Sequence, residues 1–104
     1  MKNFESLYQQ ARQEAASYAY STAGENVMIW PCGFAWVNIK PANGSFAKWI
    51  LQKGYGRKDS YLGGVTIWVG EFNQSMKHKS AFAYKLASIL SDNGIKAVAD
   101  DRID

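Results

Sequence analysis

Residues 33–39 read GFAWVNI, and the spacing of their apolar residues decides how the chain can fold. Ala35, Val37 and Ile39 occupy every second position, as expected of a β-strand that buries one face. The same alternation recurs twice, each time at an offset of 30 residues, at Val65, Ile67 and Val69 and then at Ile95, Ala97 and Ala99. We therefore predict strands near residues 34–39, 64–70 and 95–99.

Two helical stretches separate these strands. In the first, Phe46, Trp49 and Ile50 form an apolar face that ends at Gly54; in the second, apolar residues at helical spacing end at Asn93-Gly94. Each stretch follows an Asn-x-Ser sequence, at residues 43–45 and 73–75, where a helix N-cap belongs.

A third helix is predicted at the start of the chain. Apolar residues at helical spacing run from Phe4 to Tyr18, and Asn3 precedes them as a cap. The pattern fades in STAGE (21–25), which indicates a turn. A short strand at residues 27–30 could follow, with Pro31 in a hairpin turn or at a bulge.

Similar strand–helix units in series are typical of parallel strands joined by crossover helices. No linker or low-complexity segment divides the chain. We therefore predict one α/β domain over residues 1–104: an N-terminal helix followed by β-α-β-α-β, with a small three- to four-stranded, mostly parallel sheet and packed helices.

In an open parallel sheet, ligands collect outside the carboxyl ends of the strands. Two helix N-termini at that edge would favour an anion, whereas carboxylates, including Glu71, could hold a divalent cation. The plainer interpretation is helix capping and an acidic tail, and we expect the segment after Ala99 to be mobile. The residues of this candidate sheet-edge site are Asn43, Ser45, Asn73, Ser75, Asp100 and Asp101.

The composition indicates a globular protein of the cytoplasm. Its 47% hydrophobic and 14% aromatic content argues against disorder. No apolar run approaches the ~20 residues of a membrane span, and the first residues lack the apolar stretch of a secretion signal. Cys32 is the only cysteine, which excludes an internal disulfide and a multi-cysteine metal site. We expect no cofactor and no metal.

The net charge of +3 is unevenly distributed. Eight basic residues against two acidic ones lie between Lys40 and Lys85, which suits an anionic partner, although solvated helix faces account for the lysines equally well. Within this segment, GYGRKDSYLGG (54–64) interleaves aromatic and basic side chains, a combination that stacks bases and neutralises phosphates. The predicted nucleic-acid or anion-binding residues are Tyr55, Arg57, Lys58, Tyr61, Lys48 and Lys53.

The stretch CGFAWVNI (32–39) is similar to the base-stacking strand motif of RRM domains. Cys32 stands where the motif has a basic residue, and Ile39 stands where it usually has an aromatic one. That strand of an RRM follows a strand–helix–strand run, whereas here two strand–helix–strand crossovers are expected after it. We therefore reject the RRM assignment.

The aromatic residues of this stretch nevertheless share one strand face. Phe34 and Trp36 lie on it, and Trp68 lies on the matching face of the next strand. They form an exposed stacking platform if helices cover only the opposite face, and they are core if the N-terminal helix covers them. We expect the core arrangement, because an amphipathic helix needs a surface to pack on.

Catalysis has little support in the sequence. His78 is the only histidine, lies between two lysines on a face that we expect to be exposed, and is not linked by spacing to a nucleophile. Cys32 is expected to pack at a strand entry rather than to react. There is no GxxxxGK[ST] phosphate loop and no metal-ligand pair of histidines.

The succession of GFAWV, GGVTIWV, QSM and GIKAVADDRID over residues 33–104 resembles a family of small uncharacterised bacteriophage-encoded proteins. That resemblance implies action in the cytoplasm of a bacterial host by binding a host or phage macromolecule. We predict a non-enzymatic protein whose basic and aromatic surface engages nucleic acid or a nucleic-acid-handling host protein. The alternatives are a protein–protein inhibitor or adaptor of a host defence factor and a metal-dependent phosphoryl-transfer enzyme.

Overall fold

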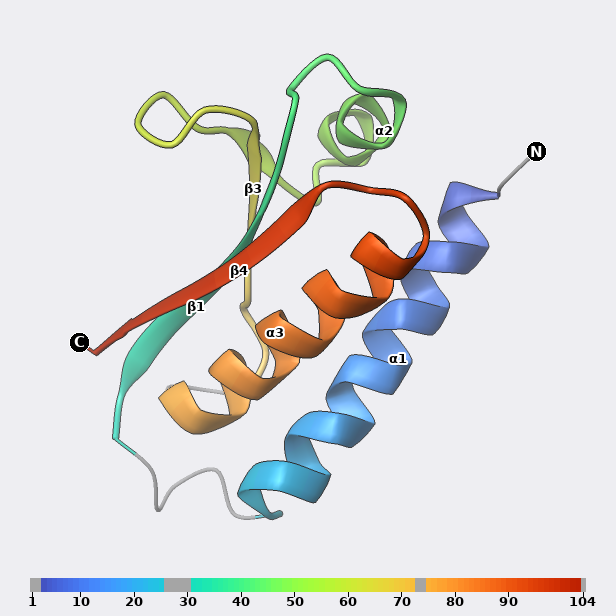
Figure 1. Ribbon diagram of the computed structural model, residues 1–104. Helices are drawn as coiled ribbons and strands as arrows, with labels where there is room; N and C mark the ends of the chain where they lie inside the picture. The colour runs from blue at the N-terminus through green and yellow to red at the C-terminus, as the bar shows by residue number, and fades with distance from the viewer. Residues whose placement is uncertain (1–2, 26–30, 73–74, 104) are drawn as a thin grey trace.

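The computed structural model describes residues 3–25, 31–72 and 75–103, and within these ranges the chain forms three helices and one four-stranded sheet (Figure 1). The α/β class predicted from the sequence is confirmed. The short strand considered at residues 27–30 lies outside the described residues. In chain order the elements are α1 (Phe4–Ala23), β1 (Gly33–Ile39), α2 (Ser45–Lys53), β2 (Arg57–Lys58), β3 (Val65–Trp68), α3 (Met76–Asp92) and β4 (Ala97–Ile103).

The sheet is antiparallel, so the predicted mostly parallel sheet is wrong. Its strand order is β2-β3-β1-β4, and each neighbouring pair runs antiparallel. The error arises at β2, whose two exposed residues, Arg57 and Lys58, carry no apolar alternation. Because β2 and β3 form a hairpin, the chain reverses once more than the 30-residue recurrence indicates, and β3 returns antiparallel to β1.

β1 lies between β3 and β4 and runs opposite to both. β3 and β4 therefore run in the same direction without pairing, and α3 connects them. From β1 onward the order is β-α-β-β-α-β, the split βαβ or ferredoxin-like arrangement. The two strand–helix–strand crossovers predicted after GFAWVNI are present, β1-α2-β2 across β3 and β3-α3-β4 across β1, and the β2-β3 hairpin lies between them.

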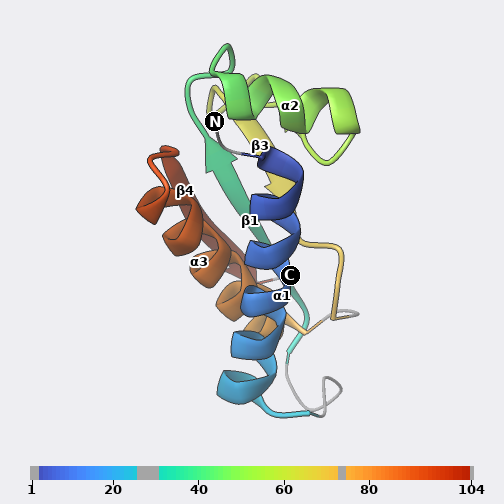
Figure 2. The ribbon, with the colours of Figure 1, turned by 90° about the vertical axis from the view of Figure 1, so that its right-hand side faces the viewer.

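α1 and α3 form a helical layer on one side of the sheet. α3 packs on β1 and β4, and α1 lies along α3 (Figures 1 and 2). Ala35 and Val37 of β1 face this layer and are at most 1% exposed. On α1, alanines at every fourth position are buried, and such small side chains let two helices approach closely; they are Ala11, Ala15, Ala19 and Ala23.

The predicted helix boundaries are largely confirmed. The Asn3 side chain caps α1 by accepting a hydrogen bond from the Ser6 amide. Gly54 ends α2 in the left-handed conformation, as a C-terminal glycine commonly does. The N-cap of α2 is Gly44, however, so the preceding Asn43 does not have the capping role that its position suggested.

Ser75 and His78 join the beginning of α3 to the end of α1. The Ser75 hydroxyl accepts a hydrogen bond from the His78 amide and lies 2.7 Å from His78 Nδ1. His78 Nε2 lies 2.6 Å from the Gly24 carbonyl oxygen, so Nε2 carries the proton, because a carbonyl only accepts. His78 is 0% exposed, and its predicted position on an exposed face is wrong.

β4 continues to Ile103, so the mobility expected after Ala99 is wrong. All seven residues of β4 pair with β1, from Ala97 opposite Ile39 to Ile103 opposite Gly33. Asp100 and Asp101 therefore lie in the middle of a paired strand, not in an acidic tail.

Replacing Gly64 with alanine should destabilise the fold. Gly64 has a φ of 67°, and a Cβ at this position would collide with the backbone carbonyl of Ile39. Both the left-handed backbone and the clash oppose any side chain, so we expect the melting temperature to fall by at least about 5 °C. The control is Gly70→Ala, whose Cβ would have no atom within 4 Å. Thermal unfolding followed by circular dichroism measures both, and equal melting temperatures would contradict the hairpin geometry.

Candidate functional site

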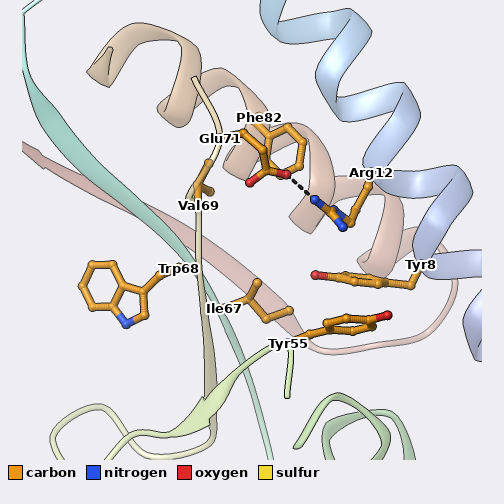
Figure 3. Close-up of a pocket in the computed structure, with 8 residues that line it drawn as sticks. All are labelled: Tyr8, Arg12, Tyr55, Ile67, Trp68, Val69, Glu71 and Phe82. Carbon is orange, nitrogen blue, oxygen red and sulfur yellow. Dashed lines mark hydrogen bonds and ion pairs between the residues drawn. The ribbon is translucent and has the colours of Figure 1, made fainter. Parts of the chain in front are cut away.

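The face of the sheet opposite the helical layer is aromatic at its centre. Phe34, Trp36 and Asn38 of β1 alternate with residues that face the helices, and so they point to this other face. Trp68 is paired with Trp36, and Figure 3 shows it on the opposite side of β3 from Ile67. The two indole rings have centroids 5.0 Å apart and planes inclined by 48°, and Trp68 is 54% exposed.

The expectation that the N-terminal helix covers the two tryptophans is therefore wrong. α1 packs on α3, in the layer on the other side of the sheet. The alternative that the sequence left open, an exposed platform with helices on only one face, is the arrangement of Trp36 and Trp68.

We call this surface the open face and define its members by strand register, because paired residues point to the same side of a sheet. The first row across the strands contains Arg57, Thr66, Asn38 and Val98. The second row contains Trp68, Trp36 and Asp100, and the third contains Phe34 and Arg102. Lys40 and Lys96 form a further row next to the first, where the Lys40 amide donates to the Lys96 carbonyl at 3.1 Å. The open face thus has four cations and one carboxylate. The cations are Arg57, Arg102, Lys40 and Lys96, and the carboxylate is Asp100.

Phe34 is held between two cations. The guanidinium carbon of Arg102 lies 5.5 Å from the centroid of its ring, and Lys79 Nζ lies 5.9 Å from it. Lys79 reaches the ring from α3 and is 6% exposed. Because both cations already lie against the Phe34 ring, the rings of the open face that remain for a flat ligand to stack on are the two tryptophans.

The loop of residues 59–64 is fastened by the Asp59 carboxylate. It accepts hydrogen bonds from the Leu62 amide, the Thr66 hydroxyl and the Tyr61 amide, at 2.7–2.9 Å. These bonds favour the ionised form and hold the pKa of Asp59 below its usual value. The loop is therefore a hairpin turn whose conformation is fixed by hydrogen bonds. It carries Tyr61 at its tip, and Tyr61 is 93% exposed.

Asn38 connects this loop to the open face. Its Nδ2 donates to the Gly63 carbonyl at 2.8 Å and to Thr66 Oγ1 at 3.1 Å. Asn38 itself is 8% exposed and lies on the same strand face as Trp36. The loop is thereby held at the edge of the open face, with Leu62 and Trp36 lining one groove.

The structure separates the residues predicted to bind nucleic acid. Arg57 belongs to the open face, whereas Lys58 is paired with Val65 and points to the other side. Tyr55 packs inside, with its ring stacked 5.2 Å from that of Tyr8. Tyr61 lies on the 59–64 loop, and Lys48 and Lys53 are exposed on α2, which is not part of the open face.

The candidate sheet-edge site is not assembled. In an antiparallel sheet, the segment after β1, with Asn43 and Ser45, lies at the opposite end from the segment that leads to Ser75. Ser75 is 1% exposed within the cap of α3. Asp100 and Asp101 point to opposite faces of β4, and Asn73 lies outside the described residues.

The carboxylates considered for a metal are also dispersed. Glu71 forms an ion pair with Arg12, and Asp101 accepts a hydrogen bond from the Ser80 hydroxyl of α3. Within the described ranges, no three His, Cys, Asp or Glu side chains are grouped so that they could hold a metal ion.

The residues considered for catalysis, His78 and Cys32, lie apart from the open face, and Ser75 is their common neighbour. Ser75 and His78 are hydrogen-bonded to each other, but both are at most 1% exposed, so a substrate reaches them only if α3 moves away from α1. Cys32, which the sequence indicated as packed, is exposed and forms an isolated bridge with Ser75.

A second, smaller hollow of about 130 Å³ lies beside α1 (Figure 3). Tyr8 and Tyr55 stack in it, and Arg12 lies 5.7 Å from the Tyr8 ring while pairing with Glu71. Burial raises the pKa of Tyr8 to about 12, in spite of the nearby Arg12 guanidinium. These groups satisfy one another and fasten α1 to the end of β3, so we assign this hollow to the fold.

No protein-family model matches the chain, and the comparisons with curated proteins and with solved structures find no match. Among the described residues, no helix is both long enough and apolar enough to cross a membrane. Any proposal about its function must therefore rest on the chemistry of the surface described above.

Three charged residues of the open face lie on or next to β4; Lys96 and Arg102 were not predicted as site residues, and Asp100 was assigned to the sheet-edge site instead. Lys96, Asp100 and Arg102 alternate with the buried residues Ala97 and Ala99. That alternation was visible, but ending the strand at residue 99 left Asp100 in a predicted acidic tail and Arg102 without a predicted role. A strand continued to residue 103 would have placed them all on one face with the tryptophans.

Replacing Tyr8 with phenylalanine should make the protein less sensitive to alkali. The pKa of Tyr8 rises from 10.0 to about 12 on folding, so its contribution is complete below pH 10 and is lost as the pH rises towards 12. At pH 11 this loss is about 1 kcal/mol. Denaturant unfolding of both proteins at pH 8 and pH 11 measures it. Equal losses in the wild type and in Tyr8→Phe would contradict a buried, neutral Tyr8.

Proposed function

We propose that this protein binds single-stranded nucleic acid on the open face and catalyses no reaction on it. The observation that carries the proposal is the adjacent pair Trp36 and Trp68 in the middle of the sheet face that no helix covers, with cations around it. The resemblance to bacteriophage-encoded proteins suggests a ligand in the cytoplasm of a bacterial host.

The tryptophans supply the sequence-tolerant part of such binding. Every base has a π-face, and stacking on an aromatic side chain contributes about 1–3 kcal/mol per base. Trp68 is 54% exposed, so a base that covers it also removes apolar surface from water. The bases of a duplex are stacked on one another and cannot cover an indole, which favours a single strand.

The cations supply the electrostatic part. Arg57 lies on one side of the tryptophans, Arg102 on another, and Lys40 and Lys96 lie at one end, with Asp100 as the one opposing charge of the open face. A chain of phosphates can pass such a set of cations while its bases turn towards the indoles. The four-stranded sheet of an RRM stacks bases in the same way, which supports the proposal by analogy only.

A protein partner is the second candidate, because part of the exposed surface is aliphatic. Val98 is 64% exposed and Ile103 is 69% exposed, both on the edge strand β4. Aliphatic side chains do not stack bases, whereas they are common in protein interfaces. Affinity capture from a bacterial lysate with and without nuclease separates the two: a partner retained after nuclease treatment favours the inhibitor or adaptor.

Removing the exposed indole should weaken binding. We expect Trp68→Ala to lower the affinity for a fluorescein-labelled oligo(dT) or oligo(U) decamer about tenfold, the loss of one stacked base. Tyr84→Ala is the control, because Tyr84 is 50% exposed but lies on α3, on the other side of the sheet. Fluorescence anisotropy measures the affinities. A decamer that does not bind, or that loses as much affinity with Tyr84→Ala, would remove the open face from consideration.

A second test compares Arg57 and Lys58, two adjacent cations of β2 whose side chains point to opposite sides of the sheet. Arg57 points to the open face and Lys58 to the opposite side, although both are exposed. Arg57→Ala should reduce the slope of log affinity against log salt by about 0.7, the value for one phosphate contact in a single strand. Lys58→Ala should leave the slope nearly unchanged. If the two substitutions act equally, the strand does not follow the open face.

A further inference from the structure

We infer that the open face contains a subsite that selects a guanine base, in the groove between Trp36 and Val98. The inference depends on the proposed binding of single-stranded nucleic acid and adds to it the identity of one base. The open face as a whole would bind any sequence, whereas this groove has one acidic and one basic end.

The groove has a volume of about 290 Å³. Its apolar lining residues are Trp36, Val98 and Leu62, the last from the fastened 59–64 loop. Lys40 and Lys96 line it as well, and so does Asp100. Apolar lining residues with both charges present suit a ligand that has a flat ring, an anionic group and a donor edge.

Strand register orders these groups along the groove. Lys40 is next to Lys96, Asn38 is paired with Val98, and Trp36 is paired with Asp100. Along β4, Lys96 and Asp100 are four residues apart, which corresponds to about 13 Å at 3.3 Å per residue. The lysines therefore stand at one end of the groove and the carboxylate at the other, with the indole beside the carboxylate.

The Asp100 carboxylate can only accept hydrogen bonds when it is ionised, and it has about four acceptor positions. One oxygen accepts from the Asp101 amide at 2.8 Å, which orients the group. Among the described residues no ion pair occupies Asp100, and the residue is exposed. A carboxylate in this condition is free to accept from a ligand that presents two donors side by side.

Guanine is the base that presents such an edge. Its ring N1–H and its exocyclic N2 amino group are adjacent donors, whereas adenine, cytosine and thymine each offer one donor group on their pairing edge. A base stacked on Trp36 has its edge directed to the neighbouring strand, because Asp100 is the paired residue there. Its phosphate then lies towards Lys40 and Lys96. For other bases the carboxylate remains unpaired beside a polyanion, which disfavours them.

The test uses fluorescein-labelled single-stranded octamers of thymidine with one central guanine, inosine, adenine or cytosine. We expect the guanine octamer to bind about tenfold more tightly than the adenine and cytosine octamers, a discrimination typical of a bidentate contact. Inosine, which lacks the N2 amino group, should bind with intermediate affinity. Fluorescence anisotropy at fixed salt measures all four.

Asp100→Asn tests whether the Asp100 carboxylate is the group that recognises the guanine edge. We expect the guanine preference to fall to within about twofold, while the affinity for oligo(dT) stays the same or increases because a negative charge has been removed. Asp92→Asn makes the same charge change at the end of α3, away from the open face, and should preserve the preference. The inference is overturned if the wild type binds all octamers equally or if the preference survives Asp100→Asn. Binding without preference leaves the proposed function standing, whereas no binding by any octamer overturns both.

Discussion

The packing of α1 against α3 determines which surface of this protein is left for a ligand. α1 buries a stripe of alanines at every fourth position, and a stripe of this kind is narrow enough to be covered by one other helix. α1 therefore lies in the helical layer with α3, where Phe4 and Tyr8 also pack against Phe46 of α2, and not on the second face of the sheet. Trp36 and Trp68 consequently stay on a face that no helix covers, and the same arrangement that completes the core also exposes the aromatic platform.

The hairpin between β2 and β3 adds a rim to that platform, and Asn38 links the two. Its side chain bonds to the Gly63 carbonyl and to the Thr66 hydroxyl, which itself donates to Asp59. A buried amide with satisfied donors fixes its partners firmly, because breaking one bond leaves a polar group without a partner. The loop that presents Tyr61 is therefore positioned by a residue of β1, and the groove between Trp36 and Val98 has a defined wall.

Local signals in the sequence located the helices and three of the four strands, but not the directions of the strands. Caps such as Asn3 and Gly54 act on adjacent backbone, so they are readable from short segments. β2 has only two charged residues and no periodicity, and without it the reversal before β3 is invisible. The residues proposed for binding divide in the same way: Arg57 and Tyr61 were predicted from local composition, whereas the exposure of Trp36 depends on what α1 packs against, which is a tertiary property.

Asp100 distinguishes the open face from a surface that merely attracts polyanions. Its neighbour Asp101 is directed into the helical layer, where Ser80 bonds to it, so adjacent carboxylates have different environments set by strand alternation alone. On a face that only neutralised phosphates, a carboxylate beside Trp36 would weaken binding. Its place in the row of the stacking indole, rather than among the lysines, aligns it with the edge of a base and away from the backbone. In the proposed complex, charge of both signs would give the strand a direction, with phosphate at the lysine end and base edge at the carboxylate end.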